Sequence, residues 1–155
     1  MKISLTINGK QEKWDITATQ TLLDALRQNG YFSVKEGCRE GTCGACTIIL
    51  NGELVNSCLV LAARARQSEI ITSEGLGTPA RPHPIQQAFV EKGTVQCGYC
   101  VPGSILAVKV LLDKNPSPDD DEIKKALDGN ICRCTGYIKR IEAVRYAAEL
   151  LRKQT

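Results

Sequence analysis

The feature that most constrains this chain is its cysteine content, because eight of its 155 residues are cysteines. They fall into two sets of four, one in each half of the chain. The first set is Cys38, Cys43, Cys46 and Cys58, and the second set is Cys97, Cys100, Cys132 and Cys134. Disulfides are rare in the cytoplasm, and the N-terminal sequence lacks the long apolar region of a signal peptide. We therefore expect a cytoplasmic protein whose thiols hold metal or have a redox role.

The rest of the composition is that of an ordinary globular protein. Hydrophobic residues make up 43% and charged residues 24% of the chain, and no apolar run approaches the roughly 18 residues that cross a bilayer. Lysine plus arginine exceed aspartate plus glutamate by 20 to 17, a formal charge of +3. This is far from the concentrated basic surface of a duplex-binding protein. We expect neither a nucleic-acid partner nor a membrane span.

The first half has the pattern of a small sheet that packs on one helix. Apolar and polar residues alternate on both sides of Asn8-Gly9, a pair that accepts the positive φ angles of a hairpin turn. Thr19 is the expected cap of a helix that carries leucines on one face and ends at Asn29-Gly30. The further expected strands cover residues 47–50, 54–61 and 69–72.

The second half has helical signals. Residues 73–84 are rich in glycine and proline, so we expect an extended connector with His83 as a solvated linker residue. The four expected helices are residues 84–92, residues 102–115, a helix opened by Ser117 with Pro118 at its first position, and residues 138–152. We expect two domains, residues 1–75 and 76–155.

The first cysteine set has the spacing C-x4-C-x2-C followed by a distant fourth cysteine. This is the plant-type pattern for a 2Fe-2S cluster, in which four thiolates hold two irons. Glycines in the same loop leave room for the backbone to approach the sulfurs and for its N–H groups to solvate their negative charge. We expect Cys58 to lie on the return strand of the second hairpin.

The second cysteine set is less diagnostic from spacing alone. Four thiolates spaced C-x2-C and C-x-C hold either zinc or a 2Fe-2S cluster. Cys100 directly precedes one expected helix, and Cys132 and Cys134 lie just before another. Helix N-termini stabilise thiolates. This favours an anionic iron-sulfur cluster but leaves zinc open.

Four segments, EGCREGTCGACTI, NSCLV, QCGYCVPG and GNICRCTGY, together resemble the small iron-sulfur subunit of the molybdenum hydroxylases, the xanthine oxidase family. The resemblance runs almost end to end. It implies an α+β fold, in which an N-terminal β-grasp domain of the plant-type ferredoxin kind is followed by a C-terminal four-helix iron-sulfur bundle domain. It also implies that all eight cysteines ligate two 2Fe-2S clusters, one in each domain.

The same resemblance implies an electron-transfer role with no catalytic residue on this chain. In this family a large subunit holds a molybdenum-pterin cofactor, and electrons pass one at a time through both clusters to FAD on a medium subunit or to another acceptor. By resemblance, Gln96 hydrogen-bonds the pterin, and Cys134 touches it while ligating iron. The expected assembly is a heterotrimer or a dimer of such heterotrimers, with an apolar contact surface on this chain.

The substrate of such a complex is set by the large subunit. We expect a purine such as xanthine or hypoxanthine, and the alternatives are nicotinate, aldehydes, carbon monoxide or other N-heterocycles. A free ferredoxin-like carrier is a further alternative. Free carriers usually present an acidic face and stay small, whereas this chain has a positive formal charge and an added helical domain.

Overall fold

The computed structural model describes residues 1–153, and its first half forms a five-stranded sheet. β1 (Lys2–Ile7) and β2 (Lys10–Asp15) form the predicted antiparallel hairpin. Asn8 and Gly9 at its turn have φ angles of 50° and 78°. Asparagine and glycine adopt such positive angles more readily than other residues, so the turn prediction is confirmed.

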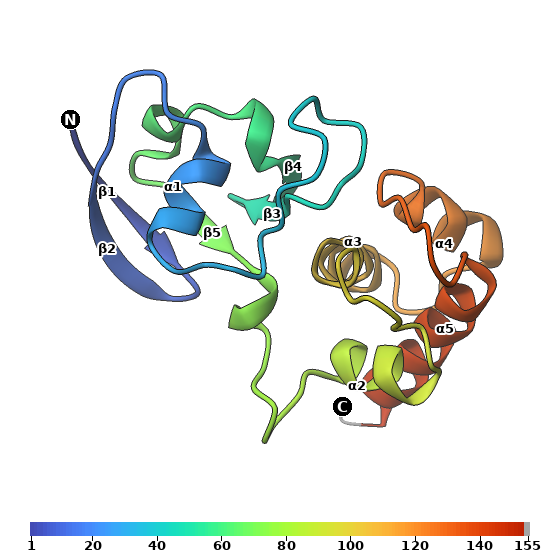
Figure 1. Cartoon of the computed structure of the whole chain (residues 1–155). Coiled ribbons are helices and arrows are strands. Elements are labelled where there is room, and N and C mark those ends of the chain that lie inside the picture. Colours follow the sequence, from blue (N-terminus) through green and yellow to red (C-terminus); the bar gives the residue numbers. More distant parts are fainter. Residues whose placement is uncertain (154–155) are drawn as a thin grey trace.

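α1 (Leu22–Gln28) packs on the sheet (Figure 1) and contributes its apolar face to the first hydrophobic core. The prediction that Thr19 caps this helix is wrong. Thr21 is the cap, because its Oγ1 accepts a hydrogen bond from the Asp24 N–H at 3.1 Å. Asn29 ends the helix, and Gly30 follows with a φ of 89°, as the sequence indicated.

The other strands are β3 (Thr47–Leu50), β4 (Glu53–Asn56) and β5 (Glu69–Ile71). The strand order is β2-β1-β5-β3-β4, and β5 lies in the middle, parallel to β1 and antiparallel to β3. Strands from both ends of this first half therefore meet at the centre of the sheet.

The expected return strand over residues 54–61 is shorter than predicted, because β4 ends at Asn56. A 3₁₀ turn, η1 (Ser57–Leu59), replaces its second half. The backbone N–H and the hydroxyl of Ser57 both donate to the carbonyl of Cys46, at 3.3 and 2.8 Å. The Val60 N–H donates to the Ser57 carbonyl at 3.4 Å and closes the 3₁₀ turn, so Cys58 lies on η1 and not on a strand.

The connector after β5 contains one short 3₁₀ turn, η3 (Ser73–Gly75), and leads into the helical half. The helices are α2 (Pro84–Glu91), α3 (Val101–Lys114), α4 (Asp120–Leu127) and α5 (Ile138–Arg152). α2 packs against α5, and α3 packs against α2 and α4. The four predicted helices are present, and the α+β fold class with a sheet module followed by a helical module is confirmed.

The cap of α4 differs from the sequence prediction. Asp119, and not Ser117, caps the helix, because its Oδ1 accepts the N–H groups of Asp121 and Glu122 at 3.0 and 2.9 Å. The Glu122 carboxylate accepts the Asp119 N–H in return. This reciprocal capping box provides acceptors both for N–H groups of the first helical turn and for the N–H of the cap residue. Because Asp119 is the cap, Pro118 lies outside the helix.

His83 is a half-buried helix cap and not the solvated linker residue that the sequence suggested. Its Nδ1 accepts the Ile85 N–H at 3.2 Å, and the Gln86 side chain accepts the His83 N–H at 2.9 Å. Burial lowers the pKa of His83, which favours the neutral ring that this acceptor role requires.

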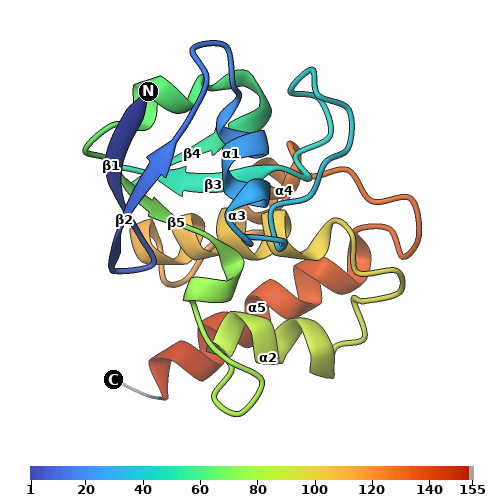
Figure 2. The ribbon, with the colours of Figure 1, turned by 60° about the vertical axis from the view of Figure 1, so that its left-hand side comes forward.

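The two halves have separate hydrophobic cores, one between the sheet and α1 and one among α2 to α5. α3 contacts both β3 and β4, so it lies between the sheet and the other helices (Figures 1 and 2). The sheet module and the helical module are thus packed directly on each other, although the predicted boundary between residues 75 and 76 stays a prediction. Among the described residues, no helix has the length and apolar character to span a membrane.

Candidate metal centres

The first cysteine set lies where the loop between α1 and β3 meets η1. Cys38 and Cys43 are on the loop, Cys46 directly precedes β3, and Cys58 is on η1. The Cys38 Sγ accepts the backbone N–H groups of Glu40 and Cys43 at 3.5 and 3.4 Å. The loop therefore already wraps its N–H donors around a sulfur, as a thiolate centre requires.

Glycines determine how closely this loop approaches its own sulfurs. A Cβ on Gly37 would lie 2.6 Å from the Cys43 Sγ, and a Cβ on Gly41, whose φ is +81°, would lie 2.4 Å from a methyl carbon of Leu59. Both distances are far below ordinary contact. The prediction that glycines let the backbone approach the sulfurs is confirmed at Gly37, whereas the close contact that Gly41 permits is with Leu59.

The sulfurs of the first set differ in burial and in acidity. Cys46 and Cys58 are buried in the first hydrophobic core, whereas Cys38 and Cys43 are partly exposed. Burial and the neighbouring Cys46 thiol raise the pKa of Cys58 to about 11. Hydrogen bonds from the Thr42 side chain and the loop backbone lower the pKa of Cys38 to about 6. Because metals bind deprotonated thiols, a cation is needed to hold Cys58 as a thiolate at neutral pH.

The second cysteine set lies at the starts of two helices. Cys100 immediately precedes α3, and Cys132 and Cys134 lie on the loop before α5. The Sγ atoms of Cys97 and Cys134 are 3.5 Å apart, and both residues are exposed. Cys100 and Cys132 are partly buried. This set thus has an exposed pair and a shielded pair.

Local donors prepare Cys132 to be a thiolate. Burial raises the pKa of Cys132, but hydrogen bonds from the Thr135 side chain and backbone, with the Arg140 charge, outweigh it and lower this pKa to about 6. The Thr135 N–H donates to the Cys132 Sγ at 3.4 Å. The loop before α5 therefore stabilises negative charge on sulfur through Thr135 and the Arg140 charge, whereas the predicted contribution of the helix N-terminus stays a prediction.

The sulfurs of both sets are arranged in pairs. No three His, Cys, Asp or Glu side chains among residues 1–153 gather closely enough for one metal ion. The interacting pairs are Cys38 with Cys43, Cys46 with Cys58, Cys97 with Cys134, and Cys100 with Cys132. Structural zinc needs four donors on one ion, whereas a 2Fe-2S cluster distributes four thiolates over two irons. The paired arrangement is compatible with such a cluster.

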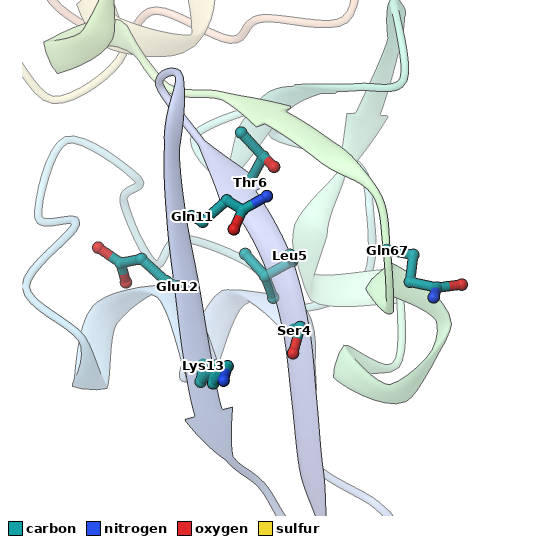
Figure 3. A pocket seen from close by; sticks show the side chains of 7 residues that line it. All are labelled: Ser4, Leu5, Thr6, Gln11, Glu12, Lys13 and Gln67. Atoms are coloured by element: carbon teal, nitrogen blue, oxygen red, sulfur yellow. The ribbon is translucent and has the colours of Figure 1, made fainter.

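A hollow of about 520 Å³ on the β1–β2 hairpin (Figure 3) is lined by none of the cysteines. Its lining residues are Ser4, Leu5, Thr6, Gln11, Glu12, Lys13 and Gln67. The Glu12 carboxylate is already bonded, because it accepts the Trp14 Nε1–H and the Tyr31 hydroxyl, each at 2.8 Å. The two cysteine sets therefore remain the candidate centres.

Comparison with known proteins identifies both centres by domain type. A family model described as a 2Fe-2S iron-sulfur cluster binding domain matches residues 5–72, and one described as a 2Fe-2S binding domain matches residues 72–145. The chain is 55% identical over 148 residues to the nicotinate dehydrogenase small FeS subunit of Eubacterium barkeri, which covers 95% of this chain and 94% of that protein. The chain belongs to the iron-sulfur electron-transfer subunits of the molybdenum hydroxylases.

Two further likenesses extend over nearly the whole subunit. It is 43% identical over 137 residues to the xanthine dehydrogenase iron-sulfur-binding subunit of Escherichia coli, covering 87% of this chain and 86% of that one. A chain in the crystal structure of quinoline 2-oxidoreductase from Pseudomonas putida 86 matches with a TM-score of 0.94 and 39% identity, covering 99% of this chain and 96% of that one. The predicted family and fold are confirmed, and 2Fe-2S, not zinc, is the cofactor type of both domains.

The subunit joins its two cysteine sets by direct hydrogen bonds. The Ile131 N–H donates to the Cys43 carbonyl at 3.0 Å, and the Asn130 Nδ2 donates to the Gly44 carbonyl at 3.0 Å. The Tyr99 hydroxyl donates to the carbonyl of Glu36. Figures 1 and 2 both show the loop of the first set, in cyan, on the same side of the molecule as the orange loop before α5. The two loops are therefore packed directly against each other.

Glycines allow this close contact between the modules. A Cβ on Gly44, whose φ is +68°, would lie 2.0 Å from the carbonyl oxygen of Gly129. A Cβ on Gly103, on α3, would lie 2.4 Å from the carbonyl oxygen of Gly44. The backbones of the two modules thus come close together at these points, where the Asn130 side chain bridges them through its hydrogen bond to the Gly44 carbonyl.

The two residues that the resemblance assigns to pterin contact lie at one exposed end of the subunit. Gln96 is exposed and adjacent in sequence to Cys97, which pairs with the exposed Cys134. The Gln96 side chain has no hydrogen-bond partner among the described residues. Its amide is therefore available to another molecule.

Sequence reasoning missed Arg140, the buried arginine of α5. Its side chain lies beside Cys100 and is fully buried. A helical signal was present, since Arg140, Ala143, Val144 and Ala147 are spaced as one face of a helix and all are buried. An arginine in an apolar stripe indicates an internal partner of opposite charge.

Proposed function

We propose that the subunit carries electrons one at a time, through two 2Fe-2S clusters, between a molybdenum-pterin site on a large subunit and an acceptor such as FAD on a medium subunit. In this proposal Cys38, Cys43, Cys46 and Cys58 ligate one cluster, and Cys97, Cys100, Cys132 and Cys134 ligate the other. The observation that carries the proposal is the 3.0 Å hydrogen bond from the Ile131 N–H to the Cys43 carbonyl. This bond holds Cys43, of the first set, directly against Ile131, the neighbour of Cys132 in the second set, so the two proposed clusters would be bound side by side.

The polypeptide would hold, solvate and shield the clusters, and the clusters when bound supply the one-electron chemistry. Backbone N–H groups already point at the Cys38 sulfur, and both the N–H and the side chain of Thr135 interact with the Cys132 sulfur. Such donors favour negative charge on the sulfurs and tune the potential of a cluster. Burial of Cys46 and Cys58 keeps water from one side of the first centre.

The partner surface in this proposal surrounds the second cysteine set. Large apolar side chains are exposed there, namely Val95, Tyr99, Ile131, Tyr137 and Ile138. Apolar patches of this kind mark protein contact sites. We place the large subunit on this face, with Gln96 and Cys134 against its pterin, in a heterotrimer with the FAD subunit. The patch also favours a dedicated subunit over a free carrier.

The substrate of the complex is proposed to be an N-heterocyclic acid of the nicotinate type. The 55% identity to a nicotinate dehydrogenase subunit exceeds the 43% identity to a xanthine dehydrogenase subunit, so nicotinate replaces the purine that the sequence alone suggested. The purified complex should hydroxylate nicotinate in preference to xanthine. If the complex hydroxylated xanthine and not nicotinate, the nicotinate proposal would be wrong and a purine would be the substrate.

The proposed compartment is the cytoplasm. All eight cysteines are free thiols in the structure, and thiols persist and assemble clusters in reducing compartments. Fractionation of cells that produce the complex tests this, with recovery in an exported fraction as the contrary result.

The ligand assignment is tested by substituting one cysteine from each set. Cys43→Ser should remove one of two electron paramagnetic resonance signals of the reduced protein, and Cys100→Ser should remove the other, because each set builds its own cluster. Each variant is the control for the other. The unsubstituted subunit should contain about four irons and about four sulfides. Loss of both signals from one substitution, or zinc in place of iron, would contradict the proposal.

A further inference from the structure

Arg140 is the one charged side chain that is fully buried in the described part of the chain. It lies in the first turn of α5, at the third residue of the helix. Burying an unpaired charge is strongly unfavourable. An arginine at this position therefore needs an anion close by.

None of the groups that Arg140 contacts in the polypeptide is a carboxylate. Its Nη2 donates to the Cys100 Sγ at 2.6 Å, and its Nη1 donates to the Ser104 Oγ at 3.1 Å and to the Asn130 carbonyl at 3.3 Å. Its guanidinium carbon lies 5.5 Å from the centre of the Tyr137 ring. The contact that can carry negative charge is the sulfur of Cys100.

One hydrogen-bond donor of Arg140 is left over. Its Nε is buried and has no acceptor among the described residues. Buried donors without acceptors are rare, and they indicate a group that the polypeptide itself does not supply. Sulfur atoms of a cluster held by Cys100 are acceptors of the right charge, so this buried donor fits the cluster of the proposed function.

We propose that Arg140 is a positioning residue that raises the reduction potential of the second cluster. The inference rests on the proposed function, because it requires Cys100 to be a ligand of that cluster. When the cluster accepts one electron from the molybdenum site, one ferric ion becomes ferrous, and the charge of the cluster with its four thiolates changes from about −2 to about −3. No proton or leaving group takes part. A buried positive charge and an N–H bond to sulfur stabilise the more negative form.

The test is redox potentiometry of the holo subunit, followed by electron paramagnetic resonance so that each cluster is read separately. Arg140→Met removes the charge and the hydrogen-bond donors but keeps an unbranched side chain that fills part of the same space. It should lower the ratio of reduced to oxidised second cluster about tenfold at a given potential, which is a shift of about 59 mV for one electron. The first cluster should keep its potential.

The matched control is Arg145→Met on the same helix. Arg145 is exposed and pairs with Asp120, so both cluster potentials should stay unchanged. Arg140→Lys keeps the charge but lacks the planar set of donors, so it should shift the second potential in the same direction by less. If Arg140→Met does not assemble the second cluster, the lysine variant decides the question.

The outcomes separate this inference from the proposed function. If Cys100→Ser abolishes one signal while the Arg140 variants leave both potentials unchanged, Arg140 is only a packing residue and the inference is overturned. If Cys100→Ser leaves both signals intact, the ligand assignment itself fails. A shift of the second potential alone, together with altered g-values of its signal, supports the role of Arg140.

Discussion

The two cysteine sets of this subunit have contrasting surroundings. In the first set, Cys46 and Cys58 are 3% and 8% exposed, inside the core formed by the sheet and α1. In the second set, Cys97 and Cys134 are exposed, and the shielding comes from helix starts and the buried Arg140 beside Cys100. The first centre is closed on its inner side by its own hydrophobic core, whereas the second is open on the outer side.

This difference shows that one chain can shield one metal centre from water and leave the other exposed to a partner protein. The core around Cys46 and Cys58 protects one side of the first centre from water, and the exposed Cys97 and Cys134 leave the second centre available to a partner. The modules meet at a close backbone contact between Gly44 and Gly103, beside the Asn130 side chain. That contact keeps the protected centre and the open centre next to each other.

The largest expected effect comes from disturbing this contact. Gly103→Ala should lower the free energy of unfolding by about 2 kcal/mol, because its Cβ would lie 2.4 Å from the Gly44 oxygen. The midpoint of thermal unfolding of the holo subunit measures the loss.

The control for this change is Gly129→Ala, where a Cβ meets nothing within 4 Å. It should alter the free energy of unfolding by less than about 0.5 kcal/mol. Alanine stabilises a helix by about 1 kcal/mol relative to glycine, and Gly103 lies on α3. If the modules did not pack tightly at this point, Gly103→Ala would therefore raise the free energy of unfolding.

A second prediction compares the two centres in the isolated holo subunit. An iron chelator should remove iron from the second centre roughly ten times faster than from the first, because exposed groups exchange through smaller openings than buried ones. The decay of the two paramagnetic signals after reduction of timed samples measures both rates. Binding of the large subunit should slow the faster phase, and equal rates would contradict the contrast in exposure.

The smallest expected effect concerns the helix caps of the second module. Asp119→Ala should cost about 1 kcal/mol of stability, since two N–H groups of α4 lose their acceptor. Ser117→Ala should cost less, because Ser117 is outside the helix. Denaturant unfolding of both variants gives the comparison, and a larger loss for Ser117→Ala would restore the cap expected from sequence.

Sequence patterns predicted well those features whose causes are local. The Asn8-Gly9 turn, the helix over residues 138–152 and the grouping of the cysteines all follow from neighbouring residues, and the structure contains each. Thr19 was wrong as a cap because capping depends on which residue adopts the extended geometry before the helix, and Thr21 does so. Several nearby residues can cap, and the tertiary path of the chain selects among them.

Two features could not be read from local pattern. Two hydrogen bonds anchor Ser57 to the carbonyl of Cys46, eleven residues earlier, and the chain turns directly after it, which places Cys58 on η1. Arg140 follows Lys139 in a run that resembles a solvated helix face, although its helical spacing placed it with buried alanines. In both cases the deciding partner lies on another segment of the chain.

The amino-acid sequence by itself determined the two sets of thiols, the glycines beside the first set and the order of sheet before helices, because spacing and local conformation are properties of short segments. The tertiary structure alone decided which sulfurs are buried, which helix face carries an internal arginine and how the Cys43 carbonyl meets the Ile131 N–H. These depend on contacts between residues far apart in the chain, whose energies appear only when the two modules pack together.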